Sequence, residues 1–458
     1  MLYDKAEAVM DDYVVETGFR IIEQKNGSIY LNNHKILLNG ALLMQFLPPY
    51  EEIPINHNCP SDEQIAKQVL MLKNMNGNTM RIHTLGYGTN DVRMAEICDR
   101  LGIMLIWVTR LIDSLESLVW EGAWLERNYY GEQMKELLNY PSVIMWEGSN
   151  EYHPKDYRVV DRMYDAFTEL INSIDSTRLI CPCSHIYYGG GLYDLGCKYY
   201  NDDGTLGQDG NPKKSGKGWT DEKVVRSVHT YSMLCGYGET WASMRKQDWK
   251  WQDEMLKSRK HSYLVTEYAV TALANPNTTE AQSNPYVESY EREDEIKIFG
   301  RPFKQAEWKE SQAYQSLCAF NAVKKMRSLG VDGMLWCCLS SGANDGSYLK
   351  PPIDFYGYKK LGFYALRDAY RDIYACKSDI DISYSVTDTI CPMIINASQQ
   401  GRFELKISIL NQEEEVIDEA FYGAFRVSEE EYKKELRPFK PKWEKEGLYT
   451  IRCELLRV

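Results

Sequence analysis

Two glutamates each close a short apolar segment. An ionised side chain there does not contribute to a hydrophobic core, so another role is indicated. Residues 140–151 read YPSVIMWEGSNE and end in Glu151, and residues 261–267 read HSYLVTE and end in Glu267. A pair of facing carboxyl groups suits cleavage of a glycosidic bond, because one can donate a proton to the leaving oxygen while the other attacks or screens the oxocarbenium-like centre. A separation of about 5 Å would favour retention of configuration. One such glutamate alone would more often be a structural ion-pair partner, but two in matching contexts favour catalysis.

The segments that carry these glutamates belong to a longer pattern, in which short apolar runs alternate with helical segments between about residues 40 and 375. The expected strands are 38–45, 79–83, 104–108, 143–147, 179–183, 227–229, 263–267 and 333–339. This alternation implies parallel strands with crossover helices, and eight of them predict a closed (β/α)8 TIM barrel of the α/β class. Because barrel active sites lie at the carboxyl ends of the strands, Asn150, Glu151 and Glu267 should face one mouth.

The segments that flank the barrel have a different pattern. Residues 13–38 alternate apolar and polar positions around Asn26-Gly27 and Asn32-Asn33, so residues 1–37 are expected to form a β lead-in. The barrel is assigned to residues 38–375. A small C-terminal all-β sandwich is assigned to residues 376–458, with strands at 380–387, 402–410, 415–420 and 449–456. Two polar insertions, at about 187–221 and 273–302, follow barrel strands.

Composition limits the class of protein and its partners. With 44% apolar and 26% charged residues, the 458-residue chain has the composition of a folded globular protein. Its net charge of −13 disfavours nucleic acid and anionic membrane surfaces as partners. Aromatic residues reach 12%, and flat amphipathic rings are what sugar-binding grooves use for stacking. The 12 cysteines form no CxxC pair and are interpreted as buried thiols.

Several motifs in order along the chain resemble glycoside hydrolase family 2, the family of β-galactosidases, β-glucuronidases and β-mannosidases. They are Thr17-Gly18-Phe19-Arg20, Leu38-Asn39-Gly40, Asn78-Thr79-Met80-Arg81, Cys98-Asp99-Arg100-Leu101-Gly102, and Pro141-Ser142-Val143-Ile144-Met145-Trp146 continuing to Asn150-Glu151. The resemblance covers most of residues 17–370 and implies a retaining exo-β-glycosidase, β-galactosidase-like, that acts on terminal β-linked sugars through a covalent glycosyl-enzyme intermediate. The family normally carries a sandwich domain before the barrel, so residues 1–37 are expected to be the tail of such an upstream domain.

The resemblance also assigns the central roles of the site. Glu151 is the expected general acid/base, Glu267 the nucleophile, and Asn150 a contact to the sugar 2-hydroxyl. Glu147 competes for the acid role but lies four residues earlier and is interpreted as a group of the barrel interior. We expect the nearby negative charge to raise the pKa of Glu151, so that the pair gives a bell-shaped pH–rate profile.

A further shell of substrate-binding residues follows from the same resemblance. Arg81 should lie beside the nucleophile Glu267. The Tyr231 hydroxyl should donate a hydrogen bond to Glu267, and His229 is expected as a second contact in the site. Trp336 corresponds to an aromatic floor under the sugar, and His83 stands near the place of the family's usual histidine. The segment Arg81-Ile82-His83 departs from the usual order of the family, and no Asn-x-Lys pair that would read a uronic acid is evident. The sugar therefore stays open.

No metal or organic cofactor is expected, because the 7 histidines show no ligand spacing such as HExxH. The expected partner is an oligosaccharide or glycoconjugate substrate, with no nucleic acid and no membrane, and a homo-oligomer is left open. The first residues lack the features of a signal peptide and no apolar run reaches 18 residues, so the localisation is left open, with the cytoplasm as the default for the chain as written. A periplasmic or secreted protein is left open if sequence precedes it.

Two other functions compete with the β-galactosidase-like interpretation. One lies within the same family, as a β-mannosidase or β-glucuronidase. The other belongs to a different class, as a non-catalytic carbohydrate-binding barrel, and the presence of both glutamates argues against it. A barrel lyase or aldolase would need a Schiff-base lysine or a phosphate-binding glycine loop at the strand ends, and neither is evident there.

Overall fold

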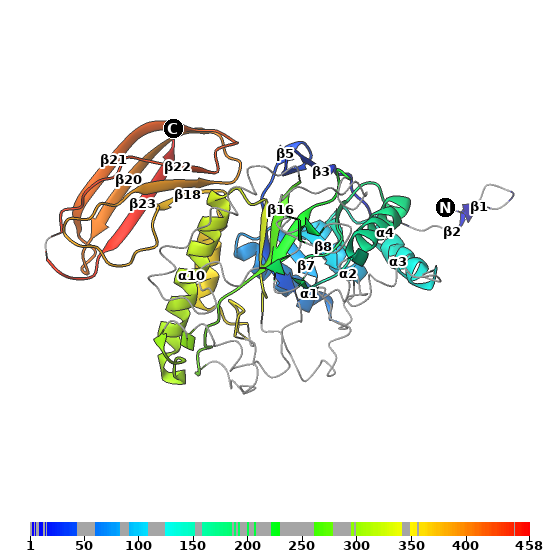
Figure 1. The fold of residues 1–458 in the computed structure, drawn as a ribbon, viewed down its shortest axis with the longest axis horizontal. Coiled ribbons are helices and arrows are strands. Elements are labelled where there is room, and N and C mark those ends of the chain that lie inside the picture. The colour runs from blue at the N-terminus through cyan, green and yellow to red at the C-terminus, as the bar shows by residue number, and fades with distance from the viewer. Residues whose placement is uncertain are drawn as a thin grey trace.

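The computed structural model of the chain describes most of the barrel and, apart from position 444, the whole C-terminal region. The described residues are 2–3, 5, 9–11, 14, 16–43, 60–82, 91–108, 124–151, 158–185, 187–188, 191–192, 199–200, 206–207, 221–229, 261–277, 295–296, 299–340, 349–354, 357–443 and 445–458. Figure 1 shows a central barrel with a separate β region toward the C-terminus.

Eight parallel strands form one sheet in the order β10-β9-β8-β7-β6-β17-β16-β15. Their bounds are β6 (Leu38–Leu43), β7 (Thr79–Ile82), β8 (Met104–Val108), β9 (Val143–Glu147), β10 (Leu179–Cys181), β15 (Arg226–His229), β16 (Tyr263–Tyr268) and β17 (Gly333–Trp336). Hydrogen bonds from Ile180 N to Lys223 O (2.9 Å) and from Val225 N to Ile180 O (2.8 Å) join β10 to the residues that lead directly into β15. The sheet therefore closes, and the predicted TIM barrel is confirmed, with strands at the expected segments.

The helices that follow the strands cover the outside of this sheet (Figure 1). They are α1 (Asp62–Asn74), α2 (Asp91–Leu101), α3 (Trp124–Leu137), α4 (Arg158–Ile174), α10 (Trp308–Ser328), preceded by the short 3₁₀ helix η3 (Gln305–Glu307), and α11 (Leu361–Ala369). Helix α1 begins at the predicted N-cap, where the Ser61 side chain accepts from Gln64 N and the Gln64 side chain accepts from Ser61 N. Its apolar residues Ile65, Val69 and Leu72 are fully buried against the barrel.

The lead-in contains a hairpin of β1 (Leu2–Tyr3) and β2 (Val9–Asp11) and a three-stranded sheet of β3 (Ile22–Lys25), β4 (Ser28–Leu31) and β5 (His34–Lys35). The predicted turns are present, because Asn26, Asn32 and Asn33 adopt positive φ angles of 51°, 51° and 66°. Gln24 binds the barrel base, donating to Val224 O (2.6 Å) and accepting from Ser262 N (2.7 Å).

The C-terminal region consists of two small antiparallel sheets whose inner faces share a hydrophobic cluster. One sheet has the order β18 (Ile373–Lys377), β19 (Pro392–Asn396), β22 (Lys433–Glu435), and the other β21 (Val416–Val427), β20 (Gly401–Leu410), β23 (Thr450–Arg457). Strand β18 crosses the boundary expected between residues 375 and 376.

One predicted strand of this region is wrong. Residues 380–387 form no strand, although apolar and polar residues alternate there. The Asp379 carboxylate accepts from Asp381 N (2.9 Å) and from the Tyr384 hydroxyl (2.7 Å), and Ser385 and Asp388 form further local hydrogen bonds. These side chains occupy backbone groups that a ladder would need, and Ile382 and Val386 are left exposed.

The two predicted insertions and the cysteines lie only partly within the described residues. In the first insertion the structure describes two short hairpins, β11 (Tyr187–Tyr188) with β12 (Gly191–Leu192), and β13 (Tyr199–Tyr200) with β14 (Leu206–Gly207). The middle of the second insertion lies outside the described residues. The cysteines in the described ranges are free thiols, most of them buried as predicted.

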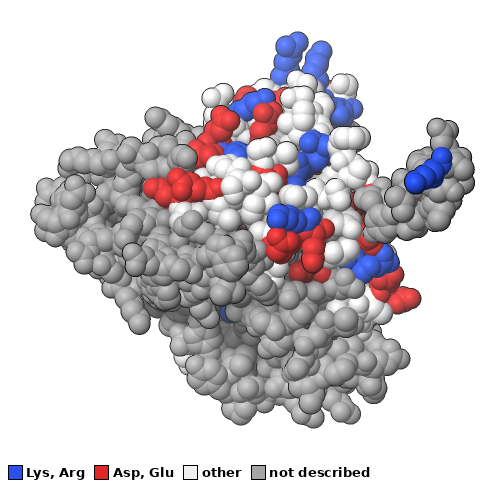
Figure 2. All heavy atoms as spheres, turned by 90° about the vertical axis from the view of Figure 1, so that its right-hand side faces the viewer, with Lys and Arg blue, Asp and Glu red and all other residues white. Residues whose placement is uncertain are grey.

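Within those same ranges, no helix combines the length and apolar character needed to cross a bilayer. On the face in Figure 2, acidic and basic side chains are interspersed over the described surface.

Candidate active site

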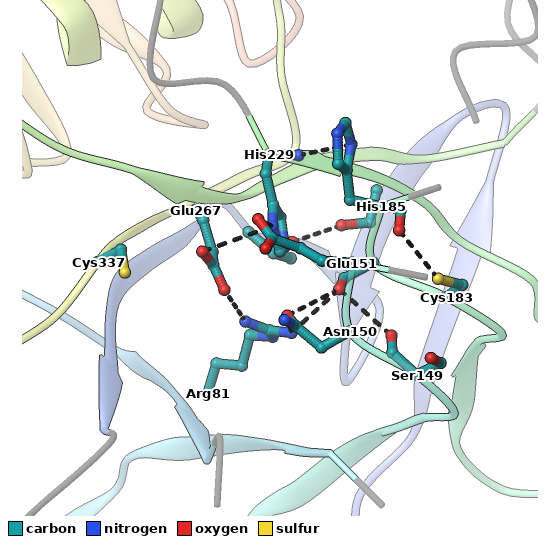
Figure 3. Close-up of polar contacts among 12 residues, drawn as sticks. Arg81, Ser149, Asn150, Glu151, Cys183, His185, His229, Glu267 and Cys337 are labelled. Carbon is teal, nitrogen blue, oxygen red and sulfur yellow. Dashed lines mark hydrogen bonds and ion pairs between the residues drawn. The ribbon is translucent and has the colours of Figure 1, made fainter. Parts of the chain in front are cut away.

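The two predicted catalytic glutamates meet at the carboxyl end of the barrel (Figure 3). Glu267 lies within β16 and is buried, while Glu151 follows the end of β9 and its side chain is 34% exposed. Carboxylate oxygens of the two residues lie within 4.8 Å of one another, with an imidazole nitrogen of His229 inside the same distance. The arrangement therefore brings two acidic groups and one base to a single point.

Arg81 fixes the position of Glu267. The arginine extends from β7, is fully buried, and donates from Nη1 to Glu267 Oε1 at 2.8 Å. Its Nε donates to Glu147 Oε2 at 2.8 Å, and its Nη2 contacts Glu147 Oε1. Burial alone would lower the pKa of Arg81, but the charges and hydrogen bonds of Glu147 and Glu267 raise it above its ordinary value. Arg81 is thus a permanent cation held between two carboxylates.

Asn150 is oriented by the same arginine. Its Oδ1 accepts from Arg81 Nη2 at 2.7 Å and from the Ser184 hydroxyl at 3.3 Å. Because a guanidinium can only donate, the oxygen of the amide must face Arg81, which leaves the Asn150 NH2 group as a donor. A donor at this place fits the expected contact to a sugar hydroxyl.

His229 contacts both glutamates from the end of β15. Its Nδ1 lies 2.7 Å from Glu151 Oε1 and 3.5 Å from Glu267 Oε2. Its Nε2 is buried with no hydrogen-bond partner among the described residues, so the tautomer with its hydrogen on Nδ1, which can donate to Glu151, costs least. In the structure the imidazole of His229 lies between the two glutamates, and its predicted part in substrate binding stays a prediction.

The surroundings of Glu151 overturn one expectation. Burial raises the pKa of Glu151 and the charge of Glu267 raises it too, but the hydrogen bond with His229 works in the opposite direction, and the pKa of Glu151 lies below its ordinary value. The expected rise in the pKa of Glu151 is therefore wrong, because an imidazole stands between the two carboxylates. Glu151 also adopts a φ of 44°, a left-handed conformation that is common for asparagine in turns but costly for glutamate, and such strain clusters at active sites.

The remaining predicted residues have different outcomes. Trp336 ends β17 with no exposed surface, and its Nε1 donates to Lys350 O at 2.9 Å, so its role under a sugar stays a prediction. Its ring packs edge-on against Tyr268 with centroids 5.1 Å apart. His83 and Tyr231 lie outside the described residues.

Two site residues were missed from the sequence. Ser184 contacts Arg81 Nη2 at 3.1 Å, and His185 stacks on His229 with ring centroids 5.3 Å apart and accepts from its backbone N–H at 3.3 Å. Both follow β10, so the rule that found Glu151 and Glu267, a polar residue just after an apolar strand, would have found them as well.

Glu151, His229 and Glu267 also form a donor set that could hold a divalent cation, since each offers one ligand atom within 4.8 Å of the others. The same three groups would carry acid, base and nucleophile chemistry, so a cation bound there would compete with that use of the site.

Comparisons with known proteins agree on the type of domain. A model of the cellulase family (glycosyl hydrolase family 5) matches residues 122–299, a segment that holds both glutamates. A β-galactosidase from Alteromonas mediterranea is 23% identical over 292 residues, which are 57% of this chain and 26% of that protein. The chain thus spans about a quarter of this curated relative. These matches support a glycosidase, and the barrel is similar to glycoside hydrolase domains.

Solved structures share the fold. A β-D-mannosidase from Dictyoglomus thermophilum is 17% identical with a TM-score of 0.63, covering 99% of this chain and 53% of that one. A GH2 β-galacturonidase from Eisenbergiella tayi, bound to galacturonate, is 16% identical with a TM-score of 0.50, covering 78% and 55%. The matching family model is of family 5 and the resemblance of the motifs is to family 2, so the finer family assignment stays a proposal.

Proposed function

We propose that this barrel is a retaining exo-β-glycosidase of the family 2 type, which cleaves terminal β-linked sugars through a covalent glycosyl-enzyme intermediate. The observation that carries the proposal is the approach of the Glu151 and Glu267 carboxylate oxygens to within 4.8 Å at the barrel mouth. Retaining enzymes hold their two carboxyl groups about 5 Å apart, whereas inverting enzymes need room for a water molecule between them.

In the first step, Glu267 attacks the anomeric carbon and the bond to the leaving oxygen breaks, with Glu151 donating a proton to that oxygen. The single hydrogen bond from Arg81 keeps the Glu267 carboxylate ionised and aimed, at 2.8 Å from Nη1. The Asn150 amide, oriented by Arg81, supplies a donor for the 2-hydroxyl, where a hydrogen bond strengthens in the transition state.

In the second step, Glu151 accepts a proton from water as the water attacks the anomeric carbon and releases Glu267. The hydrogen bond from His229 favours the ionised Glu151 that this step requires. The first step requires the protonated form, so we expect the leaving-group oxygen of the substrate to replace His229 as the partner of Glu151. This exchange would let one carboxyl group serve as acid and then as base.

We propose a terminal β-galactoside as the substrate, because the curated relative carries the name β-galactosidase. The β-mannosidase and β-glucuronidase alternatives are kept, since a β-D-mannosidase shares the fold over nearly the whole chain. A non-catalytic carbohydrate-binding barrel is the candidate from another class. It would leave the buried Arg81 and Glu267 pair without a chemical purpose.

The test uses aryl β-glycosides of galactose, glucuronic acid, mannose, glucose and fucose, with the chain, E267Q, E151Q and the exposed control E310Q. We expect release of phenol from one sugar, a loss on the order of 10⁴-fold in E267Q, and unchanged activity in E310Q. The anomer formed first, followed by NMR, should be β. An α-anomer formed first, or equal hydrolysis by the chain, E267Q and E151Q, would contradict the mechanism, and sugar binding without turnover would favour the carbohydrate-binding alternative.

A further inference from the structure

Glu147 is a buried carboxylate that the proposed reaction does not use directly. It ends β9, has no exposed surface, and pairs with β8 at Val108 and β10 at Cys181. Taking a carboxylate out of water is costly unless a cation and hydrogen bonds compensate. Both Glu147 oxygens bind Arg81, which reaches it from β7 across the intervening strand β8.

The geometry of this contact controls where the arginine points. A guanidinium is planar and presents its donors in a rigid fork. Glu147 takes the Nε and Nη2 edge of the fork, so the plane of the group is fixed, and Nη1 is left to face Glu267 at 2.8 Å. Nη2 also contacts Asn150 Oδ1 at 2.7 Å, so the same plane orients the amide.

The charge of the cluster is the second consequence. Arg81 contributes one positive charge and Glu147 and Glu267 one negative charge each, so the buried group as a whole stays negative. An arginine that paired with Glu267 alone would neutralise it fully. Because Glu147 takes two contacts of the fork, Arg81 gives Glu267 one hydrogen bond rather than two, and the carboxylate keeps the electron density that attack on carbon requires.

We propose that Glu147 is a positioning residue for the attack by Glu267: it holds the Arg81 fork in plane and shares the arginine's charge, so that the carboxylate is aimed without being neutralised. This inference rests on the proposed function. Its rival is a purely structural ion pair that only stabilises the barrel.

The test compares E147Q and E147D with a matched control, D175N. Asp175 forms another buried pair of the barrel, with Arg178 at 2.8 Å, but contacts none of the site residues described above. The readout is the rate at which a 2-deoxy-2-fluoro-β-galactosyl fluoride labels Glu267, followed by peptide mass, together with kcat, KM and the pH profile of kcat/KM on the aryl glycoside. Circular dichroism and thermal melting report the folded fraction.

In E147Q we expect labelling to slow by roughly 10- to 100-fold with little change in KM, because a misaimed group costs rate rather than binding. The acidic limb of the pH profile should move to lower pH, since Glu267 loses a negative neighbour and gains the undivided arginine. E147D keeps the charge but shortens the reach, so its acidic limb should stay near that of the unmodified chain while labelling still slows. D175N should melt at a lower temperature with both readouts unchanged.

Labelling and an acidic limb in folded E147Q equal to those of the unmodified chain would overturn the inference, as would an equal loss in E147Q and D175N. If E147Q does not fold, E147D carries the test, and an unchanged labelling rate in it overturns the aiming role. The two failures can be told apart. If the proposed function is wrong, the unmodified chain itself is not labelled at Glu267, whereas a failure of this inference alone leaves the unmodified chain labelled.

Discussion

Strand β9 is held by arginines at both ends, and the two ends differ in what accepts the hydrogen bonds. At its start, Arg178 and Arg20 both donate to the carbonyl of Val143, at 2.7 and 2.9 Å. At its far end, Arg81 donates to the carboxylate of Glu147. At the base most acceptors are neutral carbonyls, and the carboxylate of Asp175 pairs with Arg178. At the mouth one arginine is shared between two carboxylates, Glu147 and Glu267.

The electrostatic consequences are opposite. Burial and the nearby charge of Arg178 lower the pKa of Arg20 to about 10, although the charges of Asp175 and Asp99 oppose this. The hydrogen bonds of Arg20 go to the carbonyls of Pro141, Val143 and Thr177. The pKa of Arg81 is raised by its carboxylates. A buried arginine near a barrel strand is therefore informative about chemistry when two carboxylates share it, as Glu147 and Glu267 share Arg81. An arginine that binds carbonyls and a single carboxylate, as Arg178 does, fits the stabilising base of a barrel rather than its reactive mouth.

The largest effect is expected at the base. R178M removes hydrogen bonds to the carbonyls of Leu138, Tyr140 and Val143 and leaves Asp175 buried without its cation. We expect a loss of about 3–5 kcal/mol in the free energy of unfolding, measured by urea denaturation. Activity per folded molecule should not change. The exposed variant R371M is the control, and a specific loss of activity in folded R178M would erase the distinction between the two ends.

R81K tests the other end. Lysine keeps the charge but cannot present a fork, so Glu147 and Glu267 can no longer be bound at fixed places. We expect kcat/KM on the aryl glycoside to fall on the order of 100-fold, which is about 2.7 kcal/mol in the barrier. R100K, at an exposed helix position, should behave as the unmodified chain. Full activity in R81K would mean that charge alone is sufficient.

H229N sharpens the contrast within the mouth. Removing the imidazole removes the group that lowers the pKa of Glu151, while burial and the charge of Glu267 continue to raise it. Glu151 then stays protonated to higher pH, so the basic limb of the kcat/KM profile should move upward. The measurement is the pH profile of aryl glycoside hydrolysis, with exposed His34→Asn as the control. A basic limb that stays in place or moves to lower pH would contradict the assignment of Glu151 as the acid.

S184A should have the smallest effect. The Ser184 hydroxyl contacts Arg81 and Asn150 but neither glutamate. Loss of one hydrogen bond of this kind is worth about 0.5–1.5 kcal/mol, so kcat/KM should fall by roughly 2- to 10-fold. S173A, on the exposed face of α4, controls for the substitution. A fall as large as that of R81K would mean that the arginine depends on Ser184 for its position.

The barrel could be predicted from the sequence because its strands are continuous apolar runs that are buried on both faces. Strands β8 and β9 match the expected segments at both ends, and β17 is shorter than expected. The failure at residues 380–387 has the opposite cause. In a half-exposed sheet the alternation of apolar and polar residues is the only signal. Residues 380–387 have this alternation, but the Asp379 carboxylate forms local hydrogen bonds with Asp381 N and the Tyr384 hydroxyl, and these compete with pairing to a neighbouring strand.

The site was predictable where position along a strand decides it, and not where contact across the barrel decides it. Glu151, Glu267, Arg81 and Asn150 follow from strand ends and motifs and meet in the structure. The bidentate contact between Arg81 and Glu147 depends on which residues reach across β8, and the contact of His229 with Glu151 depends on side-chain direction. Neither can be read from spacing.

The four partners of Arg81 have a consequence for how such a sequence can change over evolutionary time. Glu147, Asn150, Ser184 and Glu267 come from three separate stretches of the chain, and one guanidinium serves them all. A change at any one of them alters the hydrogen bonds left for the other three. In related sequences these four positions are therefore expected to vary together. Relatives in which Glu147 alone is substituted are expected to offer Arg81 another acceptor in its place.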